Sequence, residues 1–145
     1  MRAVALSPPR QGAFLELYKR VLVVEDQPLI LLSVCEALEA GGYATLAIST
    51  GIEAATLIEG ETGQFAALVT DVRLGQGLDG WALAQRAREL NPDLAVVYMS
   101  GDSAPEHGER GVKNSMMIQK PFVGSQIVRA VSALLNLRTA QLLQK

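Results

Sequence analysis

Five short apolar runs recur along the chain, and each is separated from the next by a longer polar or amphipathic stretch. They span residues 21–24, 44–49, 67–70, 94–99 and 116–119. The runs are mostly continuous rather than alternating, which is typical of strands that a parallel sheet buries on both faces. The pattern therefore predicts five buried β-strands.

Helical patterns fill the stretches between these strands. Residues 28–40 follow the first strand, with apolar positions that recur on one helical face. Thr50 and Glu53 form a capping-box pattern ahead of a helix that continues to about residue 59. The apolar face of the first helix comprises Ile30, Leu31, Val34 and Leu38.

Two further helices are predicted in the second half of the chain. Asp79 is expected to cap the third helix, which Asn91 and Pro92 end. Ser125 is expected to cap the last helix, which runs to Leu135 or beyond. The positions expected to face inward are Leu83, Ala84, Ala87 and Leu90 in the third helix, and Ile127, Val128, Val131, Leu134 and Leu135 in the last.

The alternation of strand and helix predicts an open, doubly wound α/β sheet with helices on both faces. Residues 102–115 are the weakest part of the pattern, because Pro105, Gly108 and Gly111 interrupt a stretch of little apolar content. Any helix in this segment should be short and mobile.

A length of 145 residues predicts one domain, which we place at residues 20–137. Residues 1–19 are an N-terminal extension that either adds a short helix near residues 13–19 or is disordered. Residues 138–145 are a C-terminal tail that can continue the last helix. No DNA-binding, kinase or cyclase domain fits after that helix, so a stand-alone domain is expected.

Composition narrows the classes of function. The net charge of −2 creates no strong field that favours nucleic acid. Cys35 is the only cysteine in the sequence, so no disulfide forms within the chain, which fits a reducing cytoplasm. No signal peptide and no run of roughly 18 apolar residues is found. We expect a cytoplasmic protein that binds neither nucleic acid nor a membrane.

Charged and hydroxyl side chains follow the predicted strands at one edge of the sheet. Glu25 and Asp26 follow the first strand, Asp71 the third, Ser100 the fourth and Lys120 the fifth. In a doubly wound sheet this edge carries the active crevice. Two like charges about 4 Å apart repel by roughly 4 kcal/mol at an effective dielectric of 20, so three clustered carboxylates must take up protons or bind a cation.

The residue types point to Mg²⁺ and to phosphoryl transfer. Carboxylate oxygens suit Mg²⁺, and the sequence has no cluster of histidines or cysteines for zinc. An aspartate beside the metal can act as a nucleophile toward phosphorus. Lys120 and the metal would supply positive charge, and Ser100 would hold a phosphoryl oxygen.

These pieces of sequence resemble the receiver domain of two-component response regulators over about residues 20–137. The matching pieces are VLVVED (21–26), LVTDVRL (68–74), DGWALA (79–84), VYMSGD (97–102) and KPF (120–122). The resemblance implies a flavodoxin-like sheet of strand order 2-1-3-4-5 and a cis peptide bond between Lys120 and Pro121.

The resemblance also implies the roles of the site residues. Asp71 would be the phosphoacceptor, and Ser100 and Lys120 would contact the phosphoryl group. Glu25 and Asp26 would be the acids of the Mg²⁺ site, Asp26 as a direct ligand, with the carbonyl of Arg73 as a further ligand. Such a protein is no conventional enzyme, but it catalyses its own aspartyl phosphorylation and dephosphorylation.

A stand-alone receiver would act through protein partners. The expected phosphodonor is a sensor histidine kinase or a histidine phosphotransfer protein, and the downstream protein is unknown. Leu29 and Leu32 form a second face of the first helix that could contact a histidine-bearing helical bundle, or could be incidentally exposed. We also count Met117 among the residues expected at a partner contact.

One departure from the family pattern and one pair of charged residues bear on signalling. Met117 stands where the family often has a tyrosine or phenylalanine that switches rotamer, so we expect Ser100 and residues 102–115 to move instead. Arg73 and Asp102 should line the same opening, where an ion pair between them could prolong the lifetime of the phosphorylated state.

Three rival functions stay open from the sequence. One is an interaction module on the same fold that is never phosphorylated. An aspartyl phosphatase would want an acid where Arg73 stands, and a flavin-binding domain would want a phosphate-cradling loop after the first strand. Among isolated residues, His107 is expected to be solvated and Cys35 buried, and Trp81 opens the third helix beside the site loop, where it could be exposed.

Overall fold

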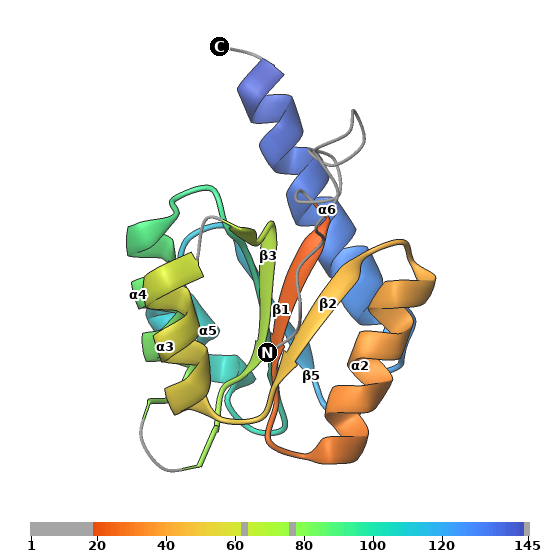
Figure 1. Cartoon of the computed structure of the whole chain (residues 1–145), viewed down its shortest axis with the longest axis vertical. Helices are drawn as coiled ribbons and strands as arrows, with labels where there is room; N and C mark the ends of the chain where they lie inside the picture. The colour runs from red at the N-terminus through yellow and green to blue at the C-terminus, as the bar shows by residue number, and fades with distance from the viewer. Residues whose placement is uncertain (1–18, 62–63, 76–77, 144–145) are drawn as a thin grey trace.

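The computed structural model describes residues 19–61, 64–75 and 78–143. Within these residues five strands form one parallel sheet in the order β2-β1-β3-β4-β5 (Figure 1). This arrangement confirms the predicted doubly wound α/β class and the strand order. The strands are β1 (Arg20–Val24), β2 (Ala44–Ile48), β3 (Ala67–Asp71), β4 (Ala95–Ser100) and β5 (Ser115–Gln119).

Helices cover both faces of the sheet. Helices α2 and α6 pack on one face, and α3 and α4 pack on the other with the short α5 (Figure 1). The helical elements are α2 (Pro28–Ala40), α3 (Gly51–Glu61), α4 (Gly80–Leu90), the 3₁₀ turn η2 (Ala104–Glu106), α5 (His107–Arg110) and α6 (Gly124–Leu143).

The two apolar layers explain why the strand sequences are continuous apolar runs. Along β1, Val21 and Val23 pack toward α2 and α6, whereas Leu22 and Val24 pack toward α3 and α4. Every residue of β3 and β4 is buried, whereas the edge strands β2 and β5 are partly exposed. Each fully buried aliphatic side chain stabilises the fold by about 1.5–3 kcal/mol, so the central strands anchor the site at their ends.

Two of the three predicted helix caps are confirmed. Glu53 N–H donates to Thr50 Oγ1 at 3.1 Å, and Ala82 N–H donates to Asp79 Oδ1 at 2.9 Å. The prediction that Ser125 caps the last helix is wrong, because α6 begins at Gly124. A glycine is needed there, since a Cβ on it would lie 2.5 Å from the Cβ of Ala37 on α2.

The helix residues that were predicted to face inward pack against the core, with one exception. Leu90 is 41% exposed, so its predicted inward position is wrong. Helix α4 ends at this residue, beyond Ala87, the last residue of the helix that is buried. Cys35 is buried, as predicted.

Residues 102–115 fold into η2 and the single turn of α5, which confirms that any helix there is short. The predicted mobility of this segment stays a prediction. The segment expected to be helical or disordered near residues 13–19 lies outside the described residues except for Lys19. The last helix continues through the predicted tail to Leu143.

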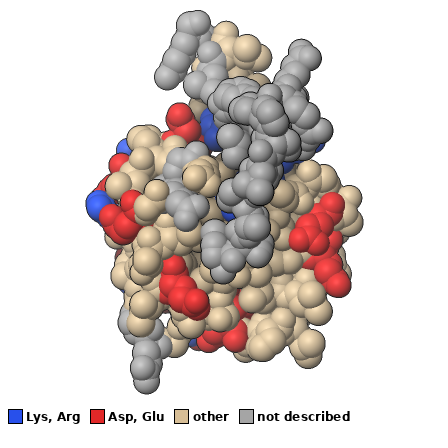
Figure 2. Space-filling model, in the orientation of Figure 1, with Lys and Arg blue, Asp and Glu red and all other residues tan. Residues whose placement is uncertain are grey.

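Surface charge is scattered on the face drawn in Figure 2. Acidic side chains of the described residues form small separate patches there, one of them over α2, and few basic side chains lie among them. No helix in the described part of the chain has the length and apolarity to cross a membrane.

Candidate functional site

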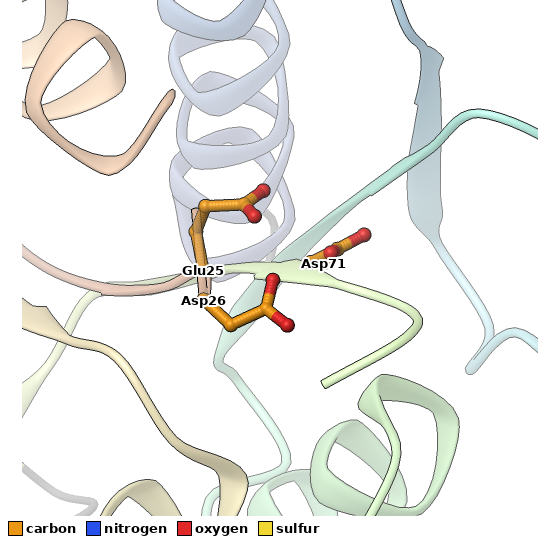
Figure 3. Close-up of side chains that lie close together, drawn as sticks. All are labelled: Glu25, Asp26 and Asp71. Carbon is orange, nitrogen blue, oxygen red and sulfur yellow. The ribbon is translucent and has the colours of Figure 1, made fainter. Parts of the chain in front are cut away.

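The carboxyl ends of the strands bring the predicted acids together. Glu25 and Asp26 directly follow β1, and Asp71 is the last residue of the neighbouring β3. One carboxylate oxygen from each of the three lies within 4.8 Å of the others (Figure 3). The cluster expected from the sequence is therefore present.

The three acids differ in their exposure to solvent. Glu25 is 0% exposed and Asp71 6% exposed, whereas Asp26 lies at the surface. The cluster thus runs from the interior to the mouth of the site. Asp26 therefore marks the solvent side of the cluster, and Glu25 marks its buried side.

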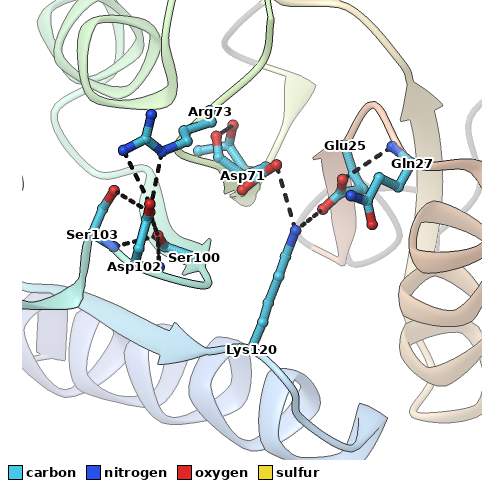
Figure 4. Close-up of polar contacts among 9 residues, drawn as sticks. Glu25, Gln27, Asp71, Arg73, Ser100, Asp102, Ser103 and Lys120 are labelled. Carbon is cyan, nitrogen blue, oxygen red and sulfur yellow. Dashed lines mark hydrogen bonds and ion pairs between the residues drawn. The ribbon is translucent and has the colours of Figure 1, made fainter.

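Lys120 compensates part of the buried negative charge. Its Nζ lies 3.0 Å from Glu25 Oε1 and 3.5 Å from Asp71 Oδ2 (Figure 4). The backbone N–H of Gln27 donates to the other oxygen of Glu25 at 3.0 Å. The Lys120–Pro121 peptide bond is cis, as the resemblance implied.

Burial dominates the ionisation of the two inner acids. It raises the pKa of Glu25, and the hydrogen bond from Lys120 offsets only part of that rise. Burial likewise raises the pKa of Asp71 against the opposing charge of Lys120. Partial burial lowers the pKa of Lys120, but its contacts with Glu25 and Asp71 outweigh this and raise it overall.

The donor set fits a hard divalent cation. Three carboxylates and one ammonium leave two uncompensated negative charges when all are ionised. The available donors are oxygens, and no nitrogen or sulfur ligand lies in the cluster. Mg²⁺ prefers such oxygen donors together with water, so the arrangement matches the predicted cofactor.

Ser100 ends the neighbouring strand β4 and is 1% exposed. Its Oγ accepts hydrogen bonds from the backbone N–H of Asp102 at 3.2 Å and of Ser103 at 2.7 Å. The hydroxyl therefore caps the turn that leads out of β4. Ser103 is itself buried, and the sequence offered no signal of its contribution, because a serine in a polar loop is ordinarily solvated.

Arg73 and Asp102 form the ion pair that the sequence suggested. Arg73 Nη2 lies 3.0 Å from Asp102 Oδ2, and Arg73 Nε donates to Asp102 Oδ1 at 3.1 Å (Figure 4). The hydrogen bond from Arg73 lowers the pKa of Asp102. Both side chains are largely exposed, at 73% and 61%, so their contribution to folding stability is small.

The backbone of Asp71 is held by the start of α4. Gly80 N–H donates to the carbonyl of Val72 at 2.7 Å. A Cβ at position 80 would collide with the carbonyl oxygen of Asp71, so only glycine permits this approach. Helix α4 therefore supports the end of β3 directly.

The residues predicted at a partner contact do not form one surface. Leu29 and Leu32 are 81% and 55% exposed on α2. Met117 packs with the core on the opposite face of the sheet, toward α3 and α4. Structure and sequence agree on the exposed leucines, whereas Met117 is partly buried and lies apart from them.

Comparison with known proteins identifies the family. Residues 21–132 match the family model described as the response regulator receiver domain. The chain belongs to this family of two-component signalling proteins.

Individual relatives agree with this assignment. The response regulator receiver protein CpdR of Brucella abortus is 29% identical over 119 residues, which cover 81% of this chain and 97% of that protein. Other curated relatives are longer, and the chain spans 12% of one and 52% of another.

Solved structures show the same fold. A response regulator receiver protein from Sinorhizobium medicae is 36% identical, with a TM-score of 0.78 over 82% of this chain and 95% of that one. The receiver domain of the sensor histidine kinase PA1611 from Pseudomonas aeruginosa is 21% identical, with a TM-score of 0.69 over 81% and 98% of the two chains. That structure has a magnesium ion coordinated in its active-site cleft.

Replacing Lys120 with methionine should destabilise the fold in a pH-dependent manner. The pKa values of Glu25 and Asp71 are already raised in the folded state, and losing the ammonium raises them further. Such groups stabilise the fold when protonated and lose that contribution as pH rises through their folded pKa values. The free energy of unfolding of Lys120→Met should therefore be about 3 kcal/mol lower than that of the wild type near pH 8, and this difference should shrink toward about pH 5.

Urea unfolding in EDTA at both pH values measures this effect. Lys113→Met is the matched control, because Lys113 is an exposed lysine. If Lys120→Met lowered the free energy of unfolding equally at both pH values, the ammonium would not stabilise the ionised forms of Glu25 and Asp71.

Proposed function

We propose that this receiver domain takes a phosphoryl group from a phosphohistidine onto Asp71, with Mg²⁺ bound beside it, and signals through protein contacts in the cytoplasm. The observation that carries the proposal is the position of Asp71. Its carboxylate lies at the end of a buried strand, 3.5 Å from Lys120 and beside two further acids. The family of the chain supports the same function.

The residues of the acidic cluster would hold the metal ion. Asp26 and Asp71 would be direct ligands together with the backbone carbonyl of Arg73. Glu25 would supply a further carboxylate on the buried side of the cluster. The magnesium ion in the PA1611 receiver domain supports this assignment. When bound, Mg²⁺ offsets the negative charge of the phosphoryl oxygens.

The transfer is a displacement at phosphorus. A carboxylate oxygen of Asp71 forms a bond to phosphorus as the bond between phosphorus and the imidazole nitrogen of the donor breaks. The electron pair of that bond returns to the imidazole. Lys120 places positive charge beside the incoming phosphoryl group. Ser100 turns its hydroxyl toward one of the phosphoryl oxygens.

Reversal of the modification needs only water. A water molecule attacks phosphorus, the bond to the Asp71 oxygen breaks, and inorganic phosphate leaves. The chain thus promotes its own phosphorylation and dephosphorylation without a conventional substrate. Positioning and charge compensation supply the catalysis, as is general for phosphoryl transfer.

Incubation with acetyl phosphate and Mg²⁺ should add one phosphoryl group to the chain. Asp71→Asn should abolish the increase in intact mass, because its amide cannot act as the nucleophile. EDTA should abolish it in the wild type. Asp93→Asn is the matched control, because Asp93 is an exposed aspartate outside the acidic cluster. Equal mass increases in Asp71→Asn and the wild type would exclude Asp71 as the acceptor, and no uptake by the wild type would favour a phosphorylation-independent interaction module.

We further propose that α2 contacts the phosphodonor. Helix α2 begins two residues after Asp26 and exposes Leu29 and Leu32. Val123, in the turn between Pro121 and α6, is 63% exposed, and α6 packs against α2. These apolar side chains border the site and suit the surface of a helical bundle that carries the phosphohistidine, from a sensor kinase or a phosphotransfer protein.

Replacing both Leu29 and Leu32 with serine should slow transfer from a phosphorylated histidine phosphotransfer domain by about tenfold or more. The rate with acetyl phosphate should stay unchanged, because the small donor needs no docking surface. Ile52→Ser is the control, because Ile52 is an apolar residue on α3 whose exposure of 64% lies between those of Leu29 and Leu32. Equal slowing with both donors would show damage to the site and contradict a docking role.

The ion pair between Arg73 and Asp102 offers a means to set the lifetime of the phosphorylated state. We propose that the pair shields the phosphoryl group from the attacking water. The two side chains reach across from the loops that follow β3 and β4. Since exposed ion pairs are weak, the effect on the hydrolysis rate should be modest.

Arg73→Ala and Asp102→Ala should each accelerate loss of the phosphoryl group by less than about tenfold. The double variant should be less than additive on a logarithmic scale, because both substitutions remove the same interaction. Decay of the phosphoprotein in excess EDTA measures the rates, with Arg129→Ala as a control at an exposed arginine of α6. Slower decay in Arg73→Ala would contradict the shield, and full additivity would show that the two residues act separately.

A further inference from the structure

An aromatic stack lies beneath α5. Trp81 of α4 and Tyr98 of β4 are fully buried, with ring centroids 4.7 Å apart. The His107 ring of α5 stacks near Trp81 at 6.5 Å and meets Tyr98 edge-on at 5.6 Å. Trp81, whose position in the sequence left exposure open, is therefore buried, and His107 is half-buried rather than solvated as predicted, because α5 packs over these rings.

Hydrogen bonds fasten the far end of α5 to the sheet. Val112 N–H donates to the hydroxyl of Tyr98 at 3.0 Å. Ser115 Oγ donates to the carbonyl of Val112 at 2.6 Å and lies 2.8 Å from His107 Nε2. His107 therefore donates to Ser115, which fixes the orientation of its ring.

Ion pairs contribute less to this attachment. Arg110 pairs with Asp79 at 3.5 Å and with Glu106 at 3.3 Å, and its guanidinium lies 5.6 Å from the Trp81 ring. The paired side chains are 42–49% exposed, and exposed pairs add little. The stack and the Tyr98 hydroxyl are thus the main contacts that hold the segment.

The near end of the same segment is tied to the phosphorylation site. Ser100 Oγ accepts the backbone N–H groups of Asp102 and Ser103. A hydroxyl that turns toward a phosphoryl group on Asp71 gives up this capping position. The chain then runs from Ser103 through η2 directly into α5, without an intervening loop that could absorb a shift.

We propose that Tyr98 is the positioning residue that couples the state of Asp71 to α5. The proposal rests on the phosphorylation of Asp71 proposed above. While Asp71 is unmodified, the Tyr98 hydroxyl holds Val112 and keeps α5 docked on Trp81. When Ser100 turns, the shift of residues 101–111 breaks the bond to Val112, and α5 and Val112 are released together.

In the family pattern the switching aromatic residue stands at the position of Met117 on β5, whereas Tyr98 lies on β4. Met117 on β5 has no hydroxyl and packs with the core, so it cannot form such a bond. Tyr98 lies opposite Met117 in the register of β4 and β5 and only two residues before Ser100. The aromatic side chain of this chain therefore lies on β4, the strand that carries Ser100.

Tyr98→Phe tests the coupling, because it removes the hydroxyl and retains the ring. Hydrogen exchange is measured with and without Mg²⁺ and beryllofluoride, a mimic of the phosphoryl group. In the wild type, beryllofluoride should accelerate exchange at residues 104–113. In Tyr98→Phe, exchange there should be fast before activation and change little afterwards.

The same variant should bind beryllofluoride about threefold more tightly, because it no longer has to break the bond to Val112. Tyr43→Phe is the matched control. Tyr43 also uses its hydroxyl in a tertiary hydrogen bond, to Ser132 at 2.7 Å on the α6 side of the sheet. It should leave both the response of residues 104–113 and the affinity at their wild-type values.

The outcomes separate the two proposals. A wild-type response and wild-type affinity in Tyr98→Phe, with normal acetyl phosphate labelling of Asp71, would overturn the coupling alone. Equal effects of Tyr43→Phe and Tyr98→Phe would show general loosening of the fold and would also overturn it. Absence of both labelling and beryllofluoride binding in the wild type would overturn the proposed function, and the coupling with it.

Discussion

Repulsion among Glu25, Asp26 and Asp71 is the constraint around which this domain is built. Burial alone would favour neutral acids at the two inner positions, and the ammonium of Lys120 restores part of their charged character. The remaining negative charge makes the site electrostatically suited to a cation. In the proposed phosphoryl transfer, added positive charge would favour the ionised, nucleophilic form of Asp71.

The parallel sheet makes this cluster possible. Glu25 and Lys120 are 95 residues apart in the chain, yet their side chains are hydrogen bonded. All five strands point the same way, so the residues that follow them meet at one edge. The apolar layers on both faces fix the strand ends in place and therefore fix the distances between charges.

Much of the fold and the acidic cluster could be predicted from the sequence, because both follow from short apolar runs and from what ends each run. The position of each strand was correct to about one residue. Asp71 and Ser100 belong to the last positions of their strands rather than to the loops beyond. The sequence analysis did not predict the pairing of Lys120 with Glu25, because the apolar pattern gives neither the strand order nor the directions of side chains at the strand ends.

The errors have a common physical cause. Whether Trp81 and His107 are exposed depends on how a one-turn helix docks, and four residues carry no periodicity from which docking can be inferred. Ser125 looked like a helix cap because its side chain could accept the required bond, but α6 begins one residue earlier, at Gly124, which lies close against Ala37 of α2. Local sequence patterns identify helices and strands, whereas tertiary contacts determine where these elements end and which of their side chains are buried.

The contact of Gly80 with the end of β3 has a consequence for how the surrounding loop can vary. The hydrogen bond from Gly80 N–H to the carbonyl of Val72 joins the two ends of the loop that follows Asp71. Lengthening a loop whose ends are joined costs only about 0.6 kcal/mol for each doubling of its length. The length of the outer part of this loop can therefore vary while the backbone of Asp71 keeps its position at the end of β3.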